Sequence, residues 1–213
     1  MSPYRRWPSL NTAGQVGAQH IVDSMPMNVI HRRLCRSETW ACTVRAQLLP
    51  WALRGVDLGG DVLEIGPGYG VTTWLLTDRA RRLTVVEVDP DLAGALNAEL
   101  GDRVRVLHGD GADLPLPQGS FDAVVCFTML HHMPSAAAQD RLFAEAARVL
   151  RPGGVFAGSD SKLSLRFRLL HIADTMVVVD SATLPHRLRA AGLVKPDVAE
   201  GPRSIRFRAF RAC

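Results

Sequence analysis

The stretch from Asp61 to Gly158 constrains the fold most, because short apolar runs alternate there with segments that carry helix signals. The clearest of these signals is Asp89-Pro90, an N-cap residue followed by a proline in the first helical turn. Short apolar runs separated by helices are typical of a parallel sheet with right-handed crossover connections. The chain is therefore predicted to be an α/β protein, with strands at residues 61–65, 83–88, 104–108, 121–127 and 155–158.

The segment before this unit is predicted to be helical. The end of the chain is predicted to be extended. Ser37 is a good N-cap for a helix with Trp40 on its apolar face, and Pro50 is expected to kink or end that helix. Two extended stretches flank the turn at residues 201–203 and are predicted to pair antiparallel at one edge of the sheet. The other predicted elements are helices at residues 135–150, 166–176 and 184–191, and the paired strands are 194–200 and 204–210.

A chain of 213 residues with 47% hydrophobic residues suits one ordinary domain. Its polar, glycine-containing start, residues 1–19, is predicted to be poorly ordered. Residues 20–213 are predicted to form a single domain, in which helices within residues 20–58 form a lid and residues 59–213 form the core with its sheet.

The sequence predicts a cytoplasmic protein without a membrane span. The longest apolar runs, residues 123–127 and 176–179, are far shorter than the roughly 20 residues of a spanning helix, and the N-terminus lacks the apolar stretch of a secretory signal. The cysteines contain no CxxC pair and no spacing that would assemble a zinc site, so we expect reduced thiols and no metal. They are Cys35, Cys42, Cys126 and Cys213.

A formal charge of +4 is a small excess for a chain of this size, so charge alone does not indicate a nucleic-acid partner. The densest basic stretch, residues 203–211, alternates arginine with apolar residues. This period of two is typical of a half-buried strand. The arginines are therefore predicted to form a solvated strand face, and no nucleic acid is expected as a partner.

The strongest local signal is a buried strand that runs into a glycine-rich turn and then a helix. Such turns place backbone N–H groups where they can bind a ligand. An acid, Glu87, ends the next predicted strand about 20 residues further on, where it can accept hydrogen bonds from both ribose hydroxyls of a nucleoside. The turn consists of Gly66, Pro67, Gly68, Tyr69 and Gly70.

Two nucleoside cofactors fit this arrangement, a dinucleotide and an adenosyl sulfonium. Dinucleotide sites use GxGxxG, whereas Gly66, Gly68 and Gly70 follow GxGxG. Glu64 also places a carboxylate beside the turn, which would oppose a phosphate but suit the ammonium group of a methionine moiety. The spacing and the charge favour the sulfonium.

With these features and three further motifs, the sequence resembles the class I S-adenosylmethionine-dependent methyltransferases, particularly those that modify small molecules. The resemblance covers residues 61–158, and its further motifs lie at residues 108–115, 119–125 and 148–154. It implies a doubly wound, seven-stranded, mostly parallel sheet of the Rossmann-like methyltransferase fold, with an antiparallel final strand between the fifth and the sixth.

The resemblance also implies how S-adenosylmethionine would be held. Asp110 would bind the adenine amino group, the backbone of Gly111 would contact the ring, and Val88 would pack on its face. Cys126 and Phe127 would border the methionine portion and the methyl group. The family more often has a side chain such as alanine at the position of Gly111, which predicts a looser adenine loop.

The methyl acceptor is expected to be a small molecule that lies beyond the carboxyl ends of the strands. His131 and His132 follow the fourth predicted strand and are candidates for a base or an orienting group. Trp40 and His171 are candidates for the acceptor pocket. A non-catalytic adenosyl-binding regulatory protein and an NAD-dependent oxidoreductase are the alternative functions.

Overall fold

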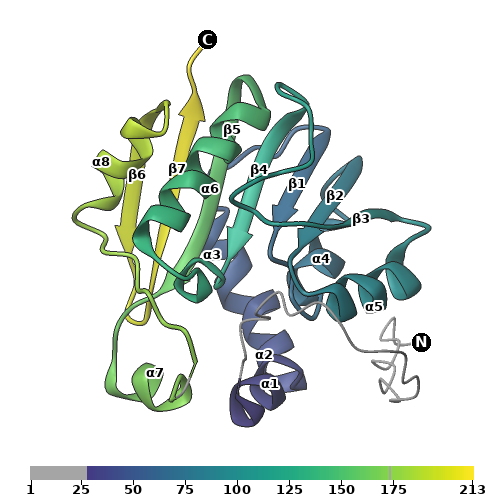
Figure 1. The fold of residues 1–213 in the computed structure, drawn as a ribbon, viewed down its shortest axis with the longest axis vertical. Helices are drawn as coiled ribbons and strands as arrows, with labels where there is room; N and C mark the ends of the chain where they lie inside the picture. The colour runs from purple at the N-terminus through teal and green to yellow at the C-terminus, as the bar shows by residue number, and fades with distance from the viewer. Residues whose placement is uncertain (1–27, 173) are drawn as a thin grey trace.

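The computed structural model describes residues 28–172 and 174–213, so the predicted disorder of residues 1–19 lies outside the described residues. The secondary structure follows the predicted alternation (Figure 1). The helices are α1 (Val29–Cys35), α2 (Glu38–Thr43), η1 (Val44–Leu48), α3 (Leu49–Ala52), α4 (Val71–Leu76), α5 (Pro90–Leu100), η2 (Leu130–His132), α6 (Ala136–Val149), α7 (Leu165–Leu170) and α8 (Leu184–Ala190). The strands are β1 (Asp61–Ile65), β2 (Arg82–Glu87), β3 (Val104–His108), β4 (Phe121–Phe127), β5 (Leu150–Ser161), β6 (Leu193–Glu200) and β7 (Ser204–Arg211).

These strands form one seven-stranded sheet in the order β3-β2-β1-β4-β5-β7-β6. Neighbouring strands from β3 to β5 pair parallel, whereas β7 pairs antiparallel with both β5 and β6. The α/β class, the seven strands and the antiparallel last strand between the fifth and the sixth are thus confirmed. Figure 1 shows α1, α2 and α7 beyond the carboxyl ends of the parallel strands.

Helices cover both faces of the sheet, so the core has two layers. On one face, Phe143 of α6 and Leu188 of α8 belong to a cluster of buried side chains with the strands. On the other face, a second cluster includes Leu49 of α3, Leu76 of α4 and Leu96 of α5. The apolar strands are buried on both sides, which explains their nearly continuous hydrophobic sequence.

The first predicted helix does not end at Pro50. Its backbone changes to a π-helical turn over Val44–Leu48 and continues as α3 to Ala52. The backbone N–H of Leu49 donates to the carbonyl oxygen of Val44, five residues back, which marks the wider turn. Pro50 then stands near the start of α3, where a missing N–H group is tolerated.

The arginines of β7 are only in part the solvated face that the alternation predicts. Arg206 and Arg208 are half-buried, because α3 and the loop after it lie over this face of β7. Arg206 Nη1 donates to the carbonyl oxygen of Trp51 at 3.0 Å, and Arg208 Nη1 donates to that of Gly55 at 3.0 Å. These two arginines therefore attach the end of α3 and the loop after it to the sheet.

The helix predicted at residues 166–176 is shorter in the structure, because α7 ends at Leu170. The chain turns there, and the side chain of Asp174 binds the backbone N–H of Asn28 at the start of α1. Among residues 28–172 and 174–213, no helix combines the length and apolar character needed to cross a bilayer.

Candidate functional site

The glycine turn after β1 takes the shape that its sequence predicts. Gly66, Gly68 and Gly70 all have positive φ angles, between 56° and 76°, which side chains rarely tolerate. A Cβ atom at Gly70 would lie 2.5 Å from Leu96 Cδ2, so α5 packs directly against the turn. At Gly68 a Cβ atom would meet nothing within 4 Å, so this part of the turn is open.

Glu87 at the end of β2 is joined to this turn, as the sequence predicts. The backbone N–H of Gly68 donates to Glu87 Oε2 at 2.8 Å, and that of Asp89 donates to Oε1 at 3.1 Å. The side chain is only 5% exposed, and burial raises the pKa of its carboxyl group. The carboxylate therefore links the turn after β1 to the end of β2.

Glu64 lies below the turn and faces α4. The hydroxyl groups of Thr72 and Thr73 donate to its two carboxylate oxygens, the latter at 2.7 Å. The residue is 1% exposed. Its carboxyl group holds the start of α4 on β1, and its contact with an ammonium group stays a prediction.

Burial raises the pKa of Glu64 from 4.5 to about 7, and the nearby Glu87 carboxylate acts in the same direction. Folding therefore favours the protonated group. Its contribution to the free energy of unfolding is fully present below pH 4.5 and is lost as the pH rises through about 7. For a shift of this size the loss is on the order of 3 kcal/mol.

We expect a Glu64→Gln variant to lack this dependence, because glutamine does not ionise. Urea unfolding at a series of pH values measures it as the difference in free energy of unfolding between wild type and variant. That difference should shift in favour of the variant between pH 4.5 and 7. A difference that does not change with pH would show that folding does not raise the pKa of this carboxyl group.

The loop after β3 packs tightly on β1. Gly111 is buried, and a Cβ atom there would lie 2.6 Å from Ile65 Cγ2. The expectation of a looser loop at Gly111 is therefore wrong, since the absent side chain allows a closer approach.

Asp110 is exposed and its Oδ1 accepts a hydrogen bond from the backbone N–H of Ala112 at 2.8 Å. Val88, 46% exposed, also offers its side chain to a ligand.

Strand β4 ends in two core residues, which are followed by an unusual backbone position. Cys126 and Phe127 are buried, in the clusters on opposite faces of the sheet. The next residue, Thr128, has a φ of +51°, a conformation that non-glycine residues seldom adopt. Its backbone N–H donates to the carbonyl oxygen of Ser159 at 2.8 Å. This special backbone position has no signal in the sequence.

His131, one of the two predicted catalytic candidates, is held by an aspartate that the sequence reasoning missed. Asp160 near the end of β5 is fully buried, and its Oδ2 accepts from the backbone N–H of His131 at 2.9 Å. Its Oδ1 lies 2.5 Å from His131 Nδ1. The opposite ring nitrogen of His131, Nε2, is buried and has no hydrogen-bond partner in the described structure.

The second candidate, His132, belongs to a group of neighbouring imidazole rings, of which that of His31 stacks on it. Its ring centroid lies 4.1 Å from that of His131, 5.4 Å from that of His171 and 5.1 Å from that of His31. Burial, followed by the charges of these neighbours, lowers the pKa of His132 to about 2. The predicted acceptor-pocket residue His171 thus lies beside both catalytic candidates.

The remaining predicted residues lie around the same end of the sheet or in the core. Pro67 is buried in the turn, while Tyr69 is half-buried below the guanidinium of Arg36, whose Cζ is 5.7 Å from the ring centroid. Trp40 is half-buried and packs against the core cluster on the α3–α5 face. Tyr69 therefore contacts Arg36 of the segment predicted to form the lid.

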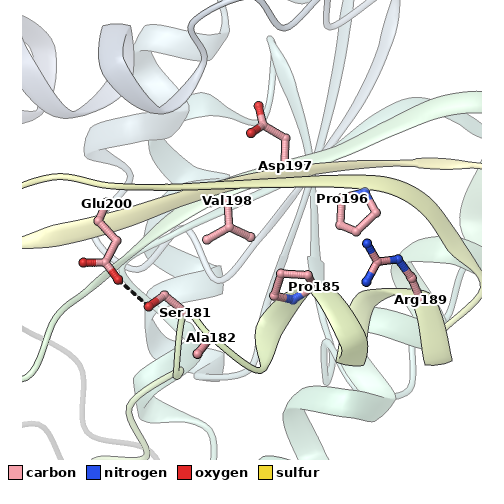
Figure 2. A pocket seen from close by; sticks show the side chains of 8 residues that line it. All are labelled: Ser181, Ala182, Pro185, Arg189, Pro196, Asp197, Val198 and Glu200. Atoms are coloured by element: carbon pink, nitrogen blue, oxygen red, sulfur yellow. Dashed lines mark hydrogen bonds between the residues drawn. The ribbon is translucent and has the colours of Figure 1, made fainter.

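A separate open pocket of about 580 Å³ lies between α8 and β6, at the far edge of the sheet from β2 (Figure 2). Ser181 Oγ donates to Glu200 Oε1 at 2.5 Å across its rim. None of the predicted site residues lines this pocket.

Comparison with known proteins agrees with the fold. The family model of the methyltransferase domain matches residues 63–158, which contain the glycine turn, Glu87 and Asp110. A Mycolicibacterium smegmatis protein named as a probable S-adenosylmethionine-dependent methyltransferase is 33% identical over 171 residues, 72% of this chain and 65% of that protein. The 27-O-demethylrifamycin SV methyltransferase of Amycolatopsis mediterranei is 44% identical over 66 residues, 31% of this chain and 23% of that protein. The matches thus span less than two thirds of the length of both relatives.

Among solved structures, a Haloferax volcanii protein in complex with the Trm112 methyltransferase activator has the same fold. Its TM-score is 0.68 at 19% identity, over 87% of this chain and 98% of that one. The sheet order, the glycine turn joined to Glu87 and the family match all point the same way. Residues 63–158 match the methyltransferase domain family, and the chain is similar to proteins named as S-adenosylmethionine-dependent methyltransferases.

Proposed function

We propose that the protein binds S-adenosylmethionine at the carboxyl ends of β1 to β4 and transfers its methyl group to a small-molecule acceptor. The observation that carries this proposal is the hydrogen bond from Gly68 to Glu87, which joins the two elements predicted to hold an adenosyl group. The cofactor fits the turn, because Gly68 has open space where a side chain would stand.

The residues around the turn would hold the cofactor by complementary chemistry. The Glu87 carboxylate would accept hydrogen bonds from the ribose hydroxyls, and the exposed Val88 side chain would pack on the adenine ring. Asp110 would accept from the adenine amino group. The methionine portion would lie along the glycine turn and beside Cys126 and Phe127, at the end of β4. When bound, the cofactor supplies an electrophilic methyl group on a sulfonium.

On the acceptor side, the chain must hold a nucleophile in line with the bond that breaks, about 3 to 3.5 Å from the methyl carbon. His131 is the better candidate for accepting a proton, because Asp160 orients its ring and leaves Nε2 available. Trp40, His132 and His171 are assigned to the walls of the acceptor pocket. The rifamycin methyltransferase match supports an acceptor of small-molecule size.

Isothermal titration with S-adenosylmethionine and with its demethylated product tests the cofactor assignment, and a methyl-transfer screen over small-molecule acceptors tests catalysis. We expect both compounds to bind and at least one acceptor to be methylated. Binding without turnover across the screen would favour the non-catalytic alternative, while NADH binding in place of both compounds would favour an oxidoreductase. We assign the reaction to the cytoplasm, which the four free thiols of the described chain support.

A His131→Gln variant separates the two halves of the proposal. We expect it to lower kcat by about 100-fold or more for an acceptor that must lose a proton, because general-base catalysis contributes at least that much. Cofactor affinity should stay within about two-fold of wild type, since His131 makes no hydrogen bond to the glycine turn, to Glu87 or to Asp110. An unchanged kcat would remove His131 from the mechanism.

A further inference from the structure

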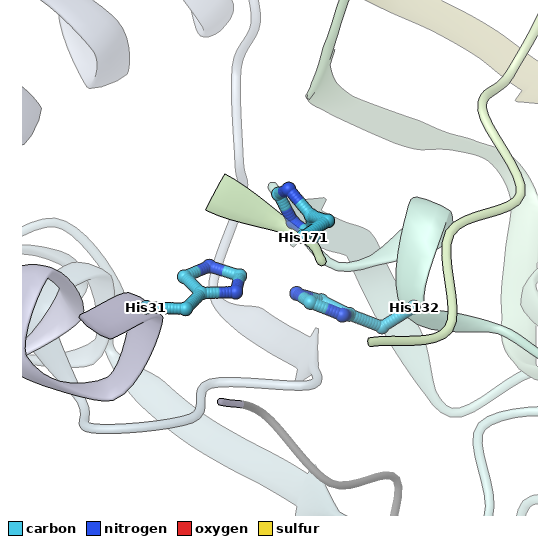
Figure 3. A group of neighbouring side chains, drawn as sticks. All are labelled: His31, His132 and His171. Atoms are coloured by element: carbon cyan, nitrogen blue, oxygen red, sulfur yellow. The ribbon is translucent and has the colours of Figure 1, made fainter. Parts of the chain in front are cut away.

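Three histidines that are far apart in the sequence meet beyond the carboxyl ends of the strands (Figure 3). His31 comes from α1, His132 from η2 and His171 from the end of α7. One ring nitrogen from each lies within 4.8 Å of those of the other two. His31 and His171 are each 5% exposed, and His132 is half-buried.

Two of the three rings are oriented by acceptors on their outer side. His31 Nδ1 lies 3.1 Å from Asp174 Oδ2, and the Asp174 side chain is 1% exposed. The backbone N–H of Asn28 donates to the other oxygen of that carboxylate at 2.6 Å. His171 Nδ1 lies 2.8 Å from the carbonyl oxygen of Phe167. Metal-binding histidines characteristically donate their second nitrogen to a carboxylate or a backbone carbonyl in this way.

One nitrogen of the three-histidine group, His171 Nε2, has an unmet need for a binding partner. His171 Nε2 is buried and has no hydrogen-bond partner in the described structure. Buried polar nitrogen atoms are almost always paired, so each exception calls for an explanation such as an ion. A ring of imidazoles with its outer nitrogens occupied and an inner nitrogen unpaired is the pattern that a cation would complete.

We propose that His31, His132 and His171 bind a divalent transition-metal ion, with zinc as the representative ion. Imidazole nitrogen suits zinc, iron, nickel and copper, whereas magnesium and calcium need oxygen ligands. In a tetrahedral zinc site the ligand nitrogens lie about 2.0–2.1 Å from the ion and so roughly 3.4 Å apart. The ring nitrogens now lie up to 4.8 Å apart, so metal binding would require them to approach one another by up to about 1.4 Å.

Three protein ligands leave one coordination position open for water or a substrate atom. The ion would lie near the proposed cofactor site. Met129, which precedes η2, packs over the turn, since a Cβ atom at Gly66 would come within 3.0 Å of the Met129 side chain. In the proposed methyl transfer, an acceptor oxygen or sulfur would take that open position. Metal binding itself does not depend on that function.

Titration of the metal-free full-length protein, without a histidine tag, with Zn²⁺ in a calorimeter tests the site. Substitution with Co²⁺ adds a readout of geometry, because tetrahedral Co²⁺ absorbs strongly in the visible range. We expect one ion per chain and a tetrahedral cobalt band. His31→Ala and His171→Ala should each weaken binding by more than the roughly 10- to 100-fold that loss of an outer-sphere partner costs.

Two further variants keep the test independent of folding defects. Asp174→Asn leaves all three ligands in place but weakens the support of His31, so zinc affinity should fall about 10- to 100-fold while the circular dichroism spectrum is retained. His186→Ala on α8 removes a histidine outside the group and should leave zinc affinity unchanged. Zinc binding that is absent in wild type, or equal in wild type and the His31 and His171 variants, would overturn the proposal. Loss of cofactor binding alone would not affect it.

Discussion

The Glu87→Gln variant is expected to bind S-adenosylmethionine about 10- to 150-fold more weakly than wild type. Hydrogen bonds to a charged group contribute roughly 1.5–3 kcal/mol, and this range corresponds to that loss of affinity. Glutamine keeps the size of the side chain but offers one acceptor oxygen where Glu87 uses two, one toward Gly68 and one toward Asp89. Its amide group would face an N–H group, so the turn itself would be less well held.

Calorimetric titration of both proteins with the cofactor and with its demethylated product measures this loss. Glu200→Gln is the matched control. Glu200 lies on β6, the edge strand far from β2, and its carboxylate pairs with Lys162 Nζ at 2.5 Å. The control should bind the cofactor as wild type does. Equal affinity in wild type and Glu87→Gln would mean that the adenosyl group does not lie at the end of β2, and the assignment of the whole site would fail.

The Gly158→Ala variant is expected to have the largest effect on stability, a loss of about 3 kcal/mol in the free energy of unfolding. Gly158 lies in β5 between Cys126 of β4 and Phe207 of β7. An added Cβ atom would lie far inside van der Waals contact with the carbonyl oxygen of Cys126 and 2.9 Å from Phe207 Cζ. Because one neighbour is backbone and the other is a fully buried ring, neither can move without shifting the sheet.

Urea unfolding measures this loss, and Gly94→Ala provides the matched control. Gly94 lies in α5, and a Cβ atom there would meet nothing within 4 Å. The same substitution should stabilise the protein at this position by about 0.5–1 kcal/mol, because alanine is the better helix former. If both variants changed stability in the same direction, close packing at Gly158 would not be the cause.

The meeting of the glycine turn with Glu87 could be predicted because both lie close together along the chain. The turn from Gly66 to Gly70 and the acid at Glu87 stand at the ends of consecutive strands, and parallel strands bring such ends to one edge of the sheet. Strand β1, the start of α4 and the start of α5 also follow their local signals to the residue. The local sequence pattern and the order of the strands were sufficient to predict these elements.

Other features depended on the packing of side chains, which no local pattern encodes. Glu64 stands beside the turn in sequence, yet its carboxyl group points to the hydroxyls of Thr72 and Thr73. The alternating arginines of β7 predict a solvated face, but α3 lies over that face and Arg206 donates to the carbonyl oxygen of Trp51. A pattern with a period of two separates the faces of a strand without saying what lies opposite each face.

The amino-acid sequence by itself determined the α/β fold, the order of its elements and the turn that joins Glu87, since these follow from hydrophobic period and from residues within one or two elements. Only the tertiary structure decided that His31, His132 and His171 form one group and that Asp160 holds His131. Such contacts arise between segments separated by long stretches of chain, and their geometry is set by the packing of α1, η2 and α7 beyond the sheet. Neither the spacing nor the composition of the sequence carries that information.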